Sequence, residues 1–123
     1  MPLRLKFILA VLLTLGILAV AQPKIVLTAS GRPAVYEFGA GYCISCKEME
    51  KVMAELKTTL GDKVEFRMVY ADKEKDLFQQ YKVMLIPTQV FLNAEGKEVD
   101  RHMGALTKEQ VLAKLKELKL IGP

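Results

Sequence analysis

Two cysteines separated by two residues are the feature that most constrains this chain. Cys43 and Cys46 are the only cysteines among its 123 residues, and they follow an apolar stretch at 34–38 and open a helical pattern. This spacing at a helix start brings both sulfurs within one turn, close enough for a disulfide. The unpaired N–H groups and positive dipole there stabilise a thiolate on the first sulfur. An exposed nucleophilic thiol with a covered resolving thiol is the minimal device for thiol–disulfide exchange.

The first 21 residues have the pattern of an export signal. Arg4 and Lys6 form a basic start, residues 7–21 carry no charge, and the run ends in Ala19-Val20-Ala21. A basic region, an apolar region and an A-x-A end predict a secretory signal that is cleaved after Ala21. The alternative is an uncleaved membrane tether through residues 7–21, although this run is shorter than the ~20 residues of a spanning helix. Either way the domain is predicted to lie outside the cytoplasm, in the periplasm or secreted.

The remaining chain is predicted to form one small domain. We expect a signal or anchor in 1–21, a short lead-in in 22–33 and a single domain in 34–123, which we expect to be monomeric. The chain has 18 basic and 14 acidic residues, and loss of Arg4 and Lys6 with the signal lowers its net charge from +4 to +2. Such a small net positive charge, without interleaved basic and aromatic residues, argues against nucleic acid as a partner.

Hydrophobic spacing divides the chain into short strands and helices in the order β, β, α, β, α, β, β, α. The best-marked helix begins at the cysteines, carries one apolar stripe and ends before Gly61. Glycine is common at the position directly after a helix. Thr107 and Gln110 form a capping box for the last helix. The predicted strands cover 25–28, 34–38, 64–70, 88–92 and 97–103, and the later helices cover 73–81 and Thr107 to the Gly122-Pro123 end.

This order predicts a mixed sheet with helices on both of its faces. Two β–α–β connections are expected to be parallel, with right-handed crossovers. The segment Asn93-Ala94-Glu95-Gly96 is expected to turn the last two strands into an antiparallel hairpin.

Five features together resemble the thioredoxin family. They are Cys43-Ile44-Ser45-Cys46 followed by Lys47, the acid Glu37 six positions before Cys43, Ile86-Pro87-Thr88, the 41-residue interval from Cys46 to Pro87, and Gly104-Ala105-Leu106-Thr107-Lys108. The segment 42–50 is also similar to the C-terminal domain of the transmembrane thiol–disulfide interchange protein. The resemblance covers nearly all of 34–118 and implies an α/β, thioredoxin-like fold. Because only 22–33 precede the first core strand, the N-terminal helix is expected to be absent or shortened.

The catalytic residues follow from the cysteine pair and the resemblance. Cys43 is expected to be the attacking thiol and Cys46 the resolving thiol of a redox-active disulfide, with a static structural bridge as the alternative. The resemblance implies that Glu37 is a buried acid that accepts the proton of Cys46; a solvent-facing glutamate is its alternative. No metal or cofactor is expected, because two thiolates supply half of a tetrahedral set and only His102 could add a nitrogen ligand.

The substrate-binding residues are expected on two segments. Ile86, Pro87 and Thr88 match the family's cis-proline loop, where Ile86 presents backbone groups to an extended substrate. An ordinary trans proline that opens an edge strand is the alternative. Tyr42 is expected to shape the surface beside the cysteines, and a simple core aromatic is the alternative for it.

The sequence therefore predicts an exported thiol–disulfide oxidoreductase, acting as a reductase of protein disulfides and supplied by a membrane thiol–disulfide electron donor. Its alternatives are a disulfide donor, or a module that binds metal or peptides without turnover. Several residues depart from the family pattern: Tyr42 replaces tryptophan, Ile44-Ser45 replaces Gly-Pro, Gly39 replaces an aromatic residue, and Met68 falls where a lysine usually faces the buried acid. The redox potential therefore cannot be carried over from the family.

Overall fold

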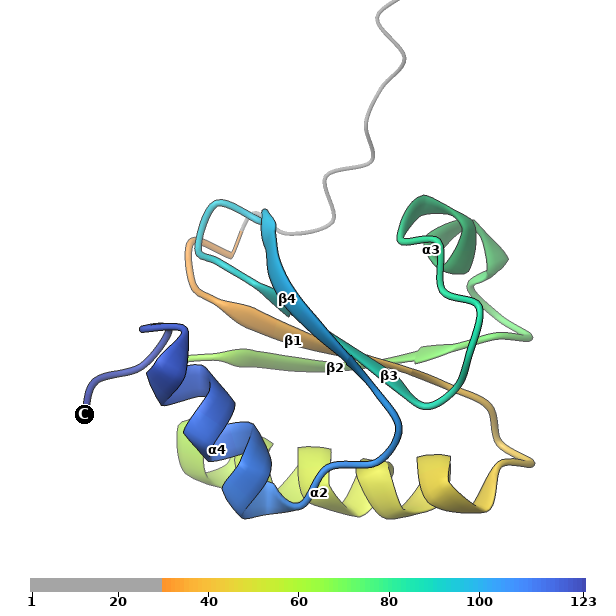
Figure 1. Cartoon of the computed structure of the whole chain (residues 1–123), viewed down its shortest axis with the longest axis horizontal. Coiled ribbons are helices and arrows are strands. Elements are labelled where there is room, and N and C mark those ends of the chain that lie inside the picture. Colours follow the sequence, from red (N-terminus) through yellow and green to blue (C-terminus); the bar gives the residue numbers. More distant parts are fainter. Residues whose placement is uncertain (1–29) are drawn as a thin grey trace, which may run out of the picture.

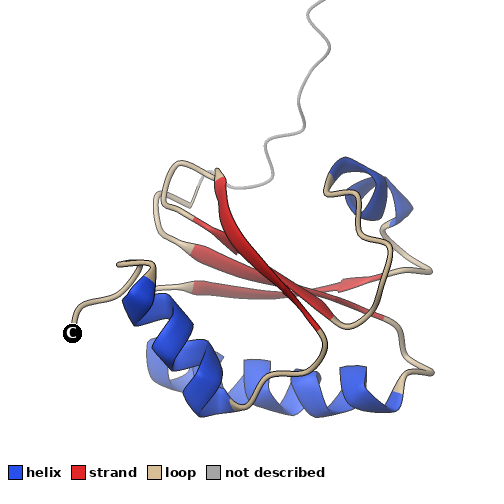
Figure 2. Cartoon of the chain, in the orientation of Figure 1, coloured by secondary structure: helices blue, strands red, loops and turns tan. Residues whose placement is uncertain are grey.

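The computed structural model describes residues 30–123, which form a central sheet covered by helices (Figures 1 and 2). Its elements follow the predicted order from residue 34 onward. The predicted strand 25–28 and the predicted export signal in residues 1–21 lie outside the described residues, as does the region in which the family's N-terminal helix would fall. Within residues 30–123, no helix is long and apolar enough to cross a membrane. The elements are β1 (Ala34–Gly39), α2 (Ile44–Leu60), β2 (Glu65–Tyr70), α3 (Lys75–Gln80), β3 (Thr88–Leu92), β4 (Glu98–Met103) and α4 (Lys108–Glu117).

The four strands form one mixed sheet in the order β2-β1-β3-β4. β1 runs parallel to β2 and antiparallel to β3, and β3 pairs antiparallel with β4 as the predicted hairpin. Helices α2 and α4 cover one face and α3 covers the other (Figure 1). The expected thioredoxin-like α/β architecture, with a mixed sheet flanked by helices, is thereby confirmed.

One predicted connection is wrong. The β2–α3–β3 unit was expected to be parallel, but β3 runs antiparallel to β1 and therefore to β2. Helix α3 has only six residues, so it spans about 9 Å, whereas a six-residue strand spans about 20 Å. The helix does not return the chain along the sheet, and β3 consequently starts at the edge where β1 and β2 end.

Both faces of β1 are buried, and its side chains alternate between two apolar clusters. Val35 packs with α2 and α4, whereas Tyr36 and Phe38 pack with α3. The rings of Tyr36 and Phe38 meet the α3 side in edge-to-face contacts at centroid distances of 5.0–6.1 Å. Burial of one such large side chain stabilises the fold by about 1.5–3 kcal/mol. This double packing makes β1 a rigid base for the loop that follows it.

The helix that carries the cysteines ends differently from the prediction. The predicted apolar stripe of α2 consists of Cys46, Met49, Met53, Leu56 and Leu60. The first four are buried, and Leu60 is partly buried. Gly61, however, caps the helix with a right-handed backbone at φ −57°. The glycine is therefore not used for a left-handed turn, and a Cβ at this position would instead collide with the Lys57 carbonyl oxygen.

The last helix is shorter than predicted. The capping box of Thr107 and Gln110 is present, but α4 ends at Glu117 rather than near Gly122-Pro123. Lys119 adopts φ +55°, and the Leu120 N–H bonds to the Leu115 carbonyl. This left-handed residue reverses the chain after Leu118, whereas the sequence pattern predicts that the helix continues to Gly122-Pro123.

Candidate active site

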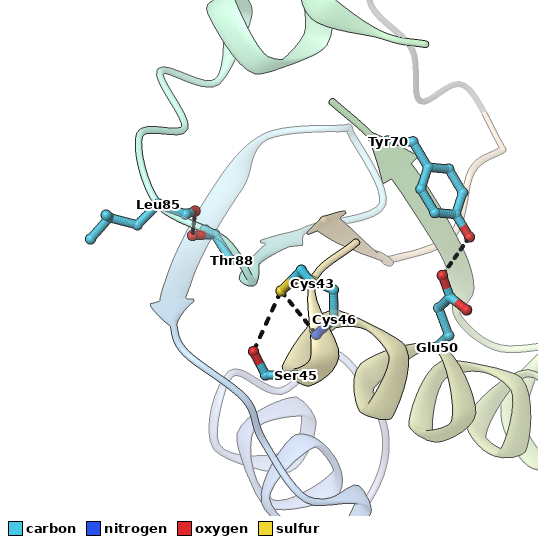
Figure 3. Close-up of a disulfide and its surroundings, with 7 residues drawn as sticks. All are labelled: Cys43, Ser45, Cys46, Glu50, Tyr70, Leu85 and Thr88. Carbon is cyan, nitrogen blue, oxygen red and sulfur yellow. Dashed lines mark hydrogen bonds between the residues drawn. A yellow bond between two sulfur atoms is a disulfide. The ribbon is translucent and has the colours of Figure 1, made fainter. Parts of the chain in front are cut away.

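The two cysteines lie at the start of α2 (Figure 3), and their sulfur atoms form a disulfide. Cys43 is the N-cap residue, with φ −90° and ψ 120°, and its sulfur accepts the backbone N–H of Cys46 at 3.3 Å. The Ser45 hydroxyl lies 3.5 Å from the same sulfur. A thiolate on Cys43 would thus face a backbone donor and a hydroxyl, both of which favour the charged form.

The two sulfurs differ in exposure, as an exchange site requires. Cys43 is partly exposed, whereas Cys46 is fully buried. Gly39, the last residue of β1, makes room for the buried sulfur. An ideal Cβ on Gly39 would lie 3.1 Å from the Cys46 Cβ and 3.2 Å from its Sγ. The glycine that departs from the family pattern is therefore in direct contact with the resolving cysteine.

The proline loop reaches the same edge of the sheet. Phe38 pairs with Thr88, so the next position along β1, Gly39, faces the position of Pro87. The Ile86–Pro87 peptide bond is cis. The buried Thr88 side chain donates a hydrogen bond to the Leu85 carbonyl at 2.6 Å (Figure 3). The hydroxyl of Thr88 is thus engaged in holding the loop together.

A further backbone bond fixes this loop to the end of the hairpin. The Gly104 N–H donates to the Pro87 carbonyl at 2.8 Å. Gly104 has φ +102°, a conformation in which side chains are strained. The positive φ therefore explains why a glycine stands at position 104, in the segment 104–108 that resembles the family.

Glu37 is buried on the face of β1 that looks toward α2. It is fully inaccessible, which excludes a solvent-facing glutamate, and it shares this face with Gly39 two positions later. Burial raises the pKa of its carboxyl from 4.5 to about 8, while the Gln89 amide opposes part of that rise. Met68 of β2 and Gln89 of β3 are its neighbours across the sheet.

The sequence matches a family model described as thioredoxin over residues 19–117. The chain belongs to the thioredoxin family. The thiol:disulfide interchange protein TxlA of Synechococcus elongatus is 35% identical over 100 residues, which cover 80% of this chain and 52% of that protein. The thiol:disulfide interchange protein DsbD of Ralstonia nicotianae is 34% identical over 96 residues, covering 72% of this chain and 16% of that protein.

Plant and animal thioredoxins are also similar to this thioredoxin-family chain. Thioredoxin Y1, chloroplastic, of Arabidopsis thaliana is 27% identical over 97 residues, or 79% of this chain and 56% of that protein. The X-ray structure of Fasciola hepatica thioredoxin superposes with a TM-score of 0.64 at 31% identity, covering 71% of this chain and 81% of that one. The chain spans about half the length of the first curated relatives that it matches.

Most of the predicted site residues lie where β1 ends and β3 begins. Cys43 and Cys46 follow the end of β1, and Pro87 and Thr88 stand at the start of β3. Tyr42 is 84% exposed, which excludes a core aromatic. Pro87 is buried and Ile86 partly exposed. His102 lies on β4 as the register partner of Gln89. No group of three or more His, Cys, Asp or Glu side chains within residues 30–123 is arranged to hold a metal ion.

Sequence reasoning missed several residues of the site. Gln89 lies fully buried beside Glu37, Ser45 faces the Cys43 sulfur, and Met84 and Leu85 are exposed before the proline loop. A polar residue inside the apolar run 88–92 was the only available signal for Gln89.

The cysteine helix is also tied to the sheet beyond the site. The Tyr70 hydroxyl, at the end of β2, donates to the Glu50 carboxylate of α2 at 3.0 Å (Figure 3). This bond fixes the first half of α2 against the strand edge at which the cysteines lie. It therefore helps to hold the disulfide in place relative to the sheet.

Proposed function

We propose that this protein is an extracytoplasmic thiol–disulfide oxidoreductase that reduces protein disulfides through the Cys43/Cys46 dithiol. One observation carries the proposal. The partly exposed Cys43 sulfur sits at the start of α2 and accepts a backbone N–H, while the fully buried Cys46 lies beneath it against Gly39. A static bridge needs no such difference between its sulfurs, whereas an attacking and a resolving thiol do.

In the reduced protein, the Cys43 thiolate attacks one sulfur of a substrate disulfide. A mixed disulfide forms, and the other substrate sulfur leaves as a thiolate that takes a proton from water. Cys46 then loses its proton to Glu37 and attacks the Cys43 sulfur. The Cys43–Cys46 disulfide forms, and the second substrate sulfur leaves as a thiolate that takes a proton from water. Two electrons have then passed from the protein to the substrate.

The surface around Cys43 suits an extended polypeptide. Tyr42, Ile44, Met84 and Leu85 are large apolar side chains that are 61–89% exposed. Within residues 30–123, the backbone of Ile86 takes part in no hydrogen bond. Its free N–H and carbonyl support the proposal that a substrate strand pairs with the loop, as in strand addition. Thr88 supports this loop from within through its bond to Leu85.

The location and direction of the reaction rest on the sequence. The basic and apolar pattern of residues 1–21 supports export, through a cleaved signal or a tether. Ile86 before Pro87 resembles reducing thioredoxins and supports a reductase. A reductase outside the cytoplasm needs an electron source, and we propose a membrane thiol–disulfide donor. The similarity to two proteins named for thiol:disulfide interchange supports this choice. Such a reductase would contribute to redox homeostasis of exported proteins.

Reduction of insulin by dithiothreitol, followed by turbidity, tests the activity. We expect the parent chain to accelerate it, Cys43→Ser to abolish the acceleration, and Cys46→Ser to accumulate mixed disulfides with its substrate. Two variants that both reduce insulin at the parent rate would contradict the proposal. Stoichiometric copper after purification, together with no insulin reduction by the parent chain, would favour the alternative of a binding module.

A further inference from the structure

Glu37 and Gln89 form a buried polar pair in an otherwise apolar layer of the protein. They are direct partners in the register of β1 and β3, and both side chains are fully buried. Partners of this kind have their Cβ atoms about 4.5–5.5 Å apart. Within the described part of the chain, the carboxyl oxygens of Glu37 and the amide atoms of Gln89 have no hydrogen bond of ordinary geometry.

An unpaired arrangement of these groups would be costly. A buried donor or acceptor without a partner costs about 1–3 kcal/mol. Gln89 is nevertheless close enough to lower the pKa of Glu37 against the effect of burial. The terminal torsions of Glu and Gln are broad, so a small rotation aligns the two groups. The other cross-strand neighbour, Met68, offers no N–H or O–H donor to the carboxyl.

The chemistry of an amide fits both protonation states of the acid. When Glu37 is protonated, its O–H can donate to the Gln89 carbonyl oxygen. When Glu37 is ionised, the Gln89 NH₂ group can donate to the carboxylate. A half-turn of the amide converts one arrangement into the other. A lysine would favour only the ionised acid, and an aliphatic side chain would satisfy neither form.

We propose that Gln89 is a positioning residue that holds Glu37 in both of its protonation states, so that Glu37 can take the proton of Cys46 and release it again. This inference rests on the proposed function, in which Cys46 must lose its proton before it attacks the Cys43 sulfur. The proton moves from the Cys46 sulfur to a Glu37 oxygen as the Gln89 amide turns from donor to acceptor. It returns to water after the substrate thiol has left.

Several other titratable or charged groups lie on the same face of the sheet and must be distinguished from Gln89. His102 is the partner of Gln89 on β4, and Tyr70 and Glu50 form their own hydrogen bond. Asp100 is paired with Lys114. Burial raises the pKa of Glu37 and the Gln89 amide lowers it in part, so we expect these other groups to have little influence on it.

The test is a titration of Glu37 by NMR in the full reduced chain with ¹³C-labelled glutamate. We expect Gln89→Met to move the midpoint of Glu37 upward by about one pH unit. In this variant the ionised acid loses a charge-assisted hydrogen bond, whereas the protonated acid loses only a weaker neutral one. The protonated form of Glu37 is therefore favoured. Methionine has a similar length and suits an apolar site, so the variant should fold. Met68→Leu, at the other neighbour of Glu37, is the matched control and should leave the midpoint unchanged, as should His102→Asn.

A second measurement separates positioning from packing. The resolution of a mixed disulfide, followed in single-turnover experiments across pH, should shift to higher pH in Gln89→Met. In a Glu37→Gln background the same substitution should have no further effect on the rate, because Gln89 acts only through Glu37. An unchanged Glu37 midpoint, or an equal loss of rate in both backgrounds, would overturn the inference. Failure of the parent chain to reduce disulfides would instead refute the proposed function, while the NMR titration would still test the pair.

Discussion

A methyl group added at Gly39 tests how closely the sheet supports the resolving cysteine. In Gly39→Ala the new Cβ would lie 3.1 Å from the Cys46 Cβ and 3.2 Å from its sulfur. Carbon atoms pack best at about 3.5–4.0 Å, so the cysteine must move by a few tenths of an ångström. Overpacking of this kind costs about 1–3 kcal/mol. Replacing glycine by alanine also reduces the backbone freedom of the unfolded chain, which stabilises the folded state by about 0.4–1 kcal/mol and offsets part of this cost. We therefore expect the free energy of unfolding to fall by about 1–2 kcal/mol.

The loss should depend on the redox state. In the oxidised protein Cys46 is held by its bond to Cys43 and cannot rotate away from the methyl group. In the reduced protein its side chain is free to adjust. If the oxidised form loses about 1 kcal/mol more than the reduced form, the redox potential of the pair rises by about 20 mV, because 30 mV corresponds to ~1.4 kcal/mol for two electrons.

Urea unfolding of both redox states measures this effect directly. Gly41→Ala is the matched control, because a Cβ at Gly41 meets nothing within 4 Å. Gly41 lies in the turn that follows β1, two residues after Gly39, and we expect this variant to be as stable as the parent chain or slightly more stable. If Gly39→Ala proves as stable as Gly41→Ala in both redox states, the account of Cys46 packing against this glycine is wrong.

Three further predictions concern the acid, the helix start and the proline loop. The pKa of Glu37 is about 8 in the folded chain and near 4.5 when unfolded. The folded state therefore keeps a proton that the unfolded state releases, and stability should fall as pH rises from about 4.5 to about 8. Glu37→Gln should remove this slope, on the order of 3–5 kcal/mol in total; urea unfolding across pH that retains the slope would contradict the assignment. Ser45→Ala removes the hydroxyl beside the Cys43 sulfur, and we expect slower alkylation of Cys43 by iodoacetamide at neutral pH; an unchanged rate would show that the hydroxyl does not stabilise the thiolate. Thr88→Val leaves the Leu85 carbonyl without its donor and should lower stability by about 1–2 kcal/mol and raise KM for insulin, whereas an unchanged KM would separate this bond from substrate binding.

The local features of the site were accessible from the sequence because each depends on residues close together in the chain. The helix start at the cysteines follows from their spacing and from the apolar stripe behind them. Residues 88–92 were predicted with the bounds that β3 has, since Pro87 and the turn at 93–96 delimit an apolar run. The capping box of α4 was predicted from two residues three positions apart.

The features that the sequence did not predict depend on contacts between distant segments. The direction of β3 depends on where the chain re-enters the sheet after the short helix α3, which hydrophobic spacing does not encode. The burial of Gln89 depends on the register between β1 and β3, since the same polar residue on an exposed face would look identical in sequence. The contact between Gly39 and Cys46 likewise requires the position of α2 on the sheet. The early end of α4 depends on Lys119 in a left-handed conformation, which the residue type does not favour.

The equilibrium redox potential of the Cys43–Cys46 pair tests the central claim most directly. The purified chain would be equilibrated with dithiothreitol or glutathione buffers, and its free thiols would be trapped and counted at each potential. We expect one reversible two-electron transition that lies closer to the thioredoxin value of about −270 mV than to the strongly oxidising value of about −120 mV. A value near the oxidising end would make the protein a disulfide donor and contradict the proposed direction. A disulfide that is not reversibly reduced anywhere in this range would contradict a catalytic role for the pair.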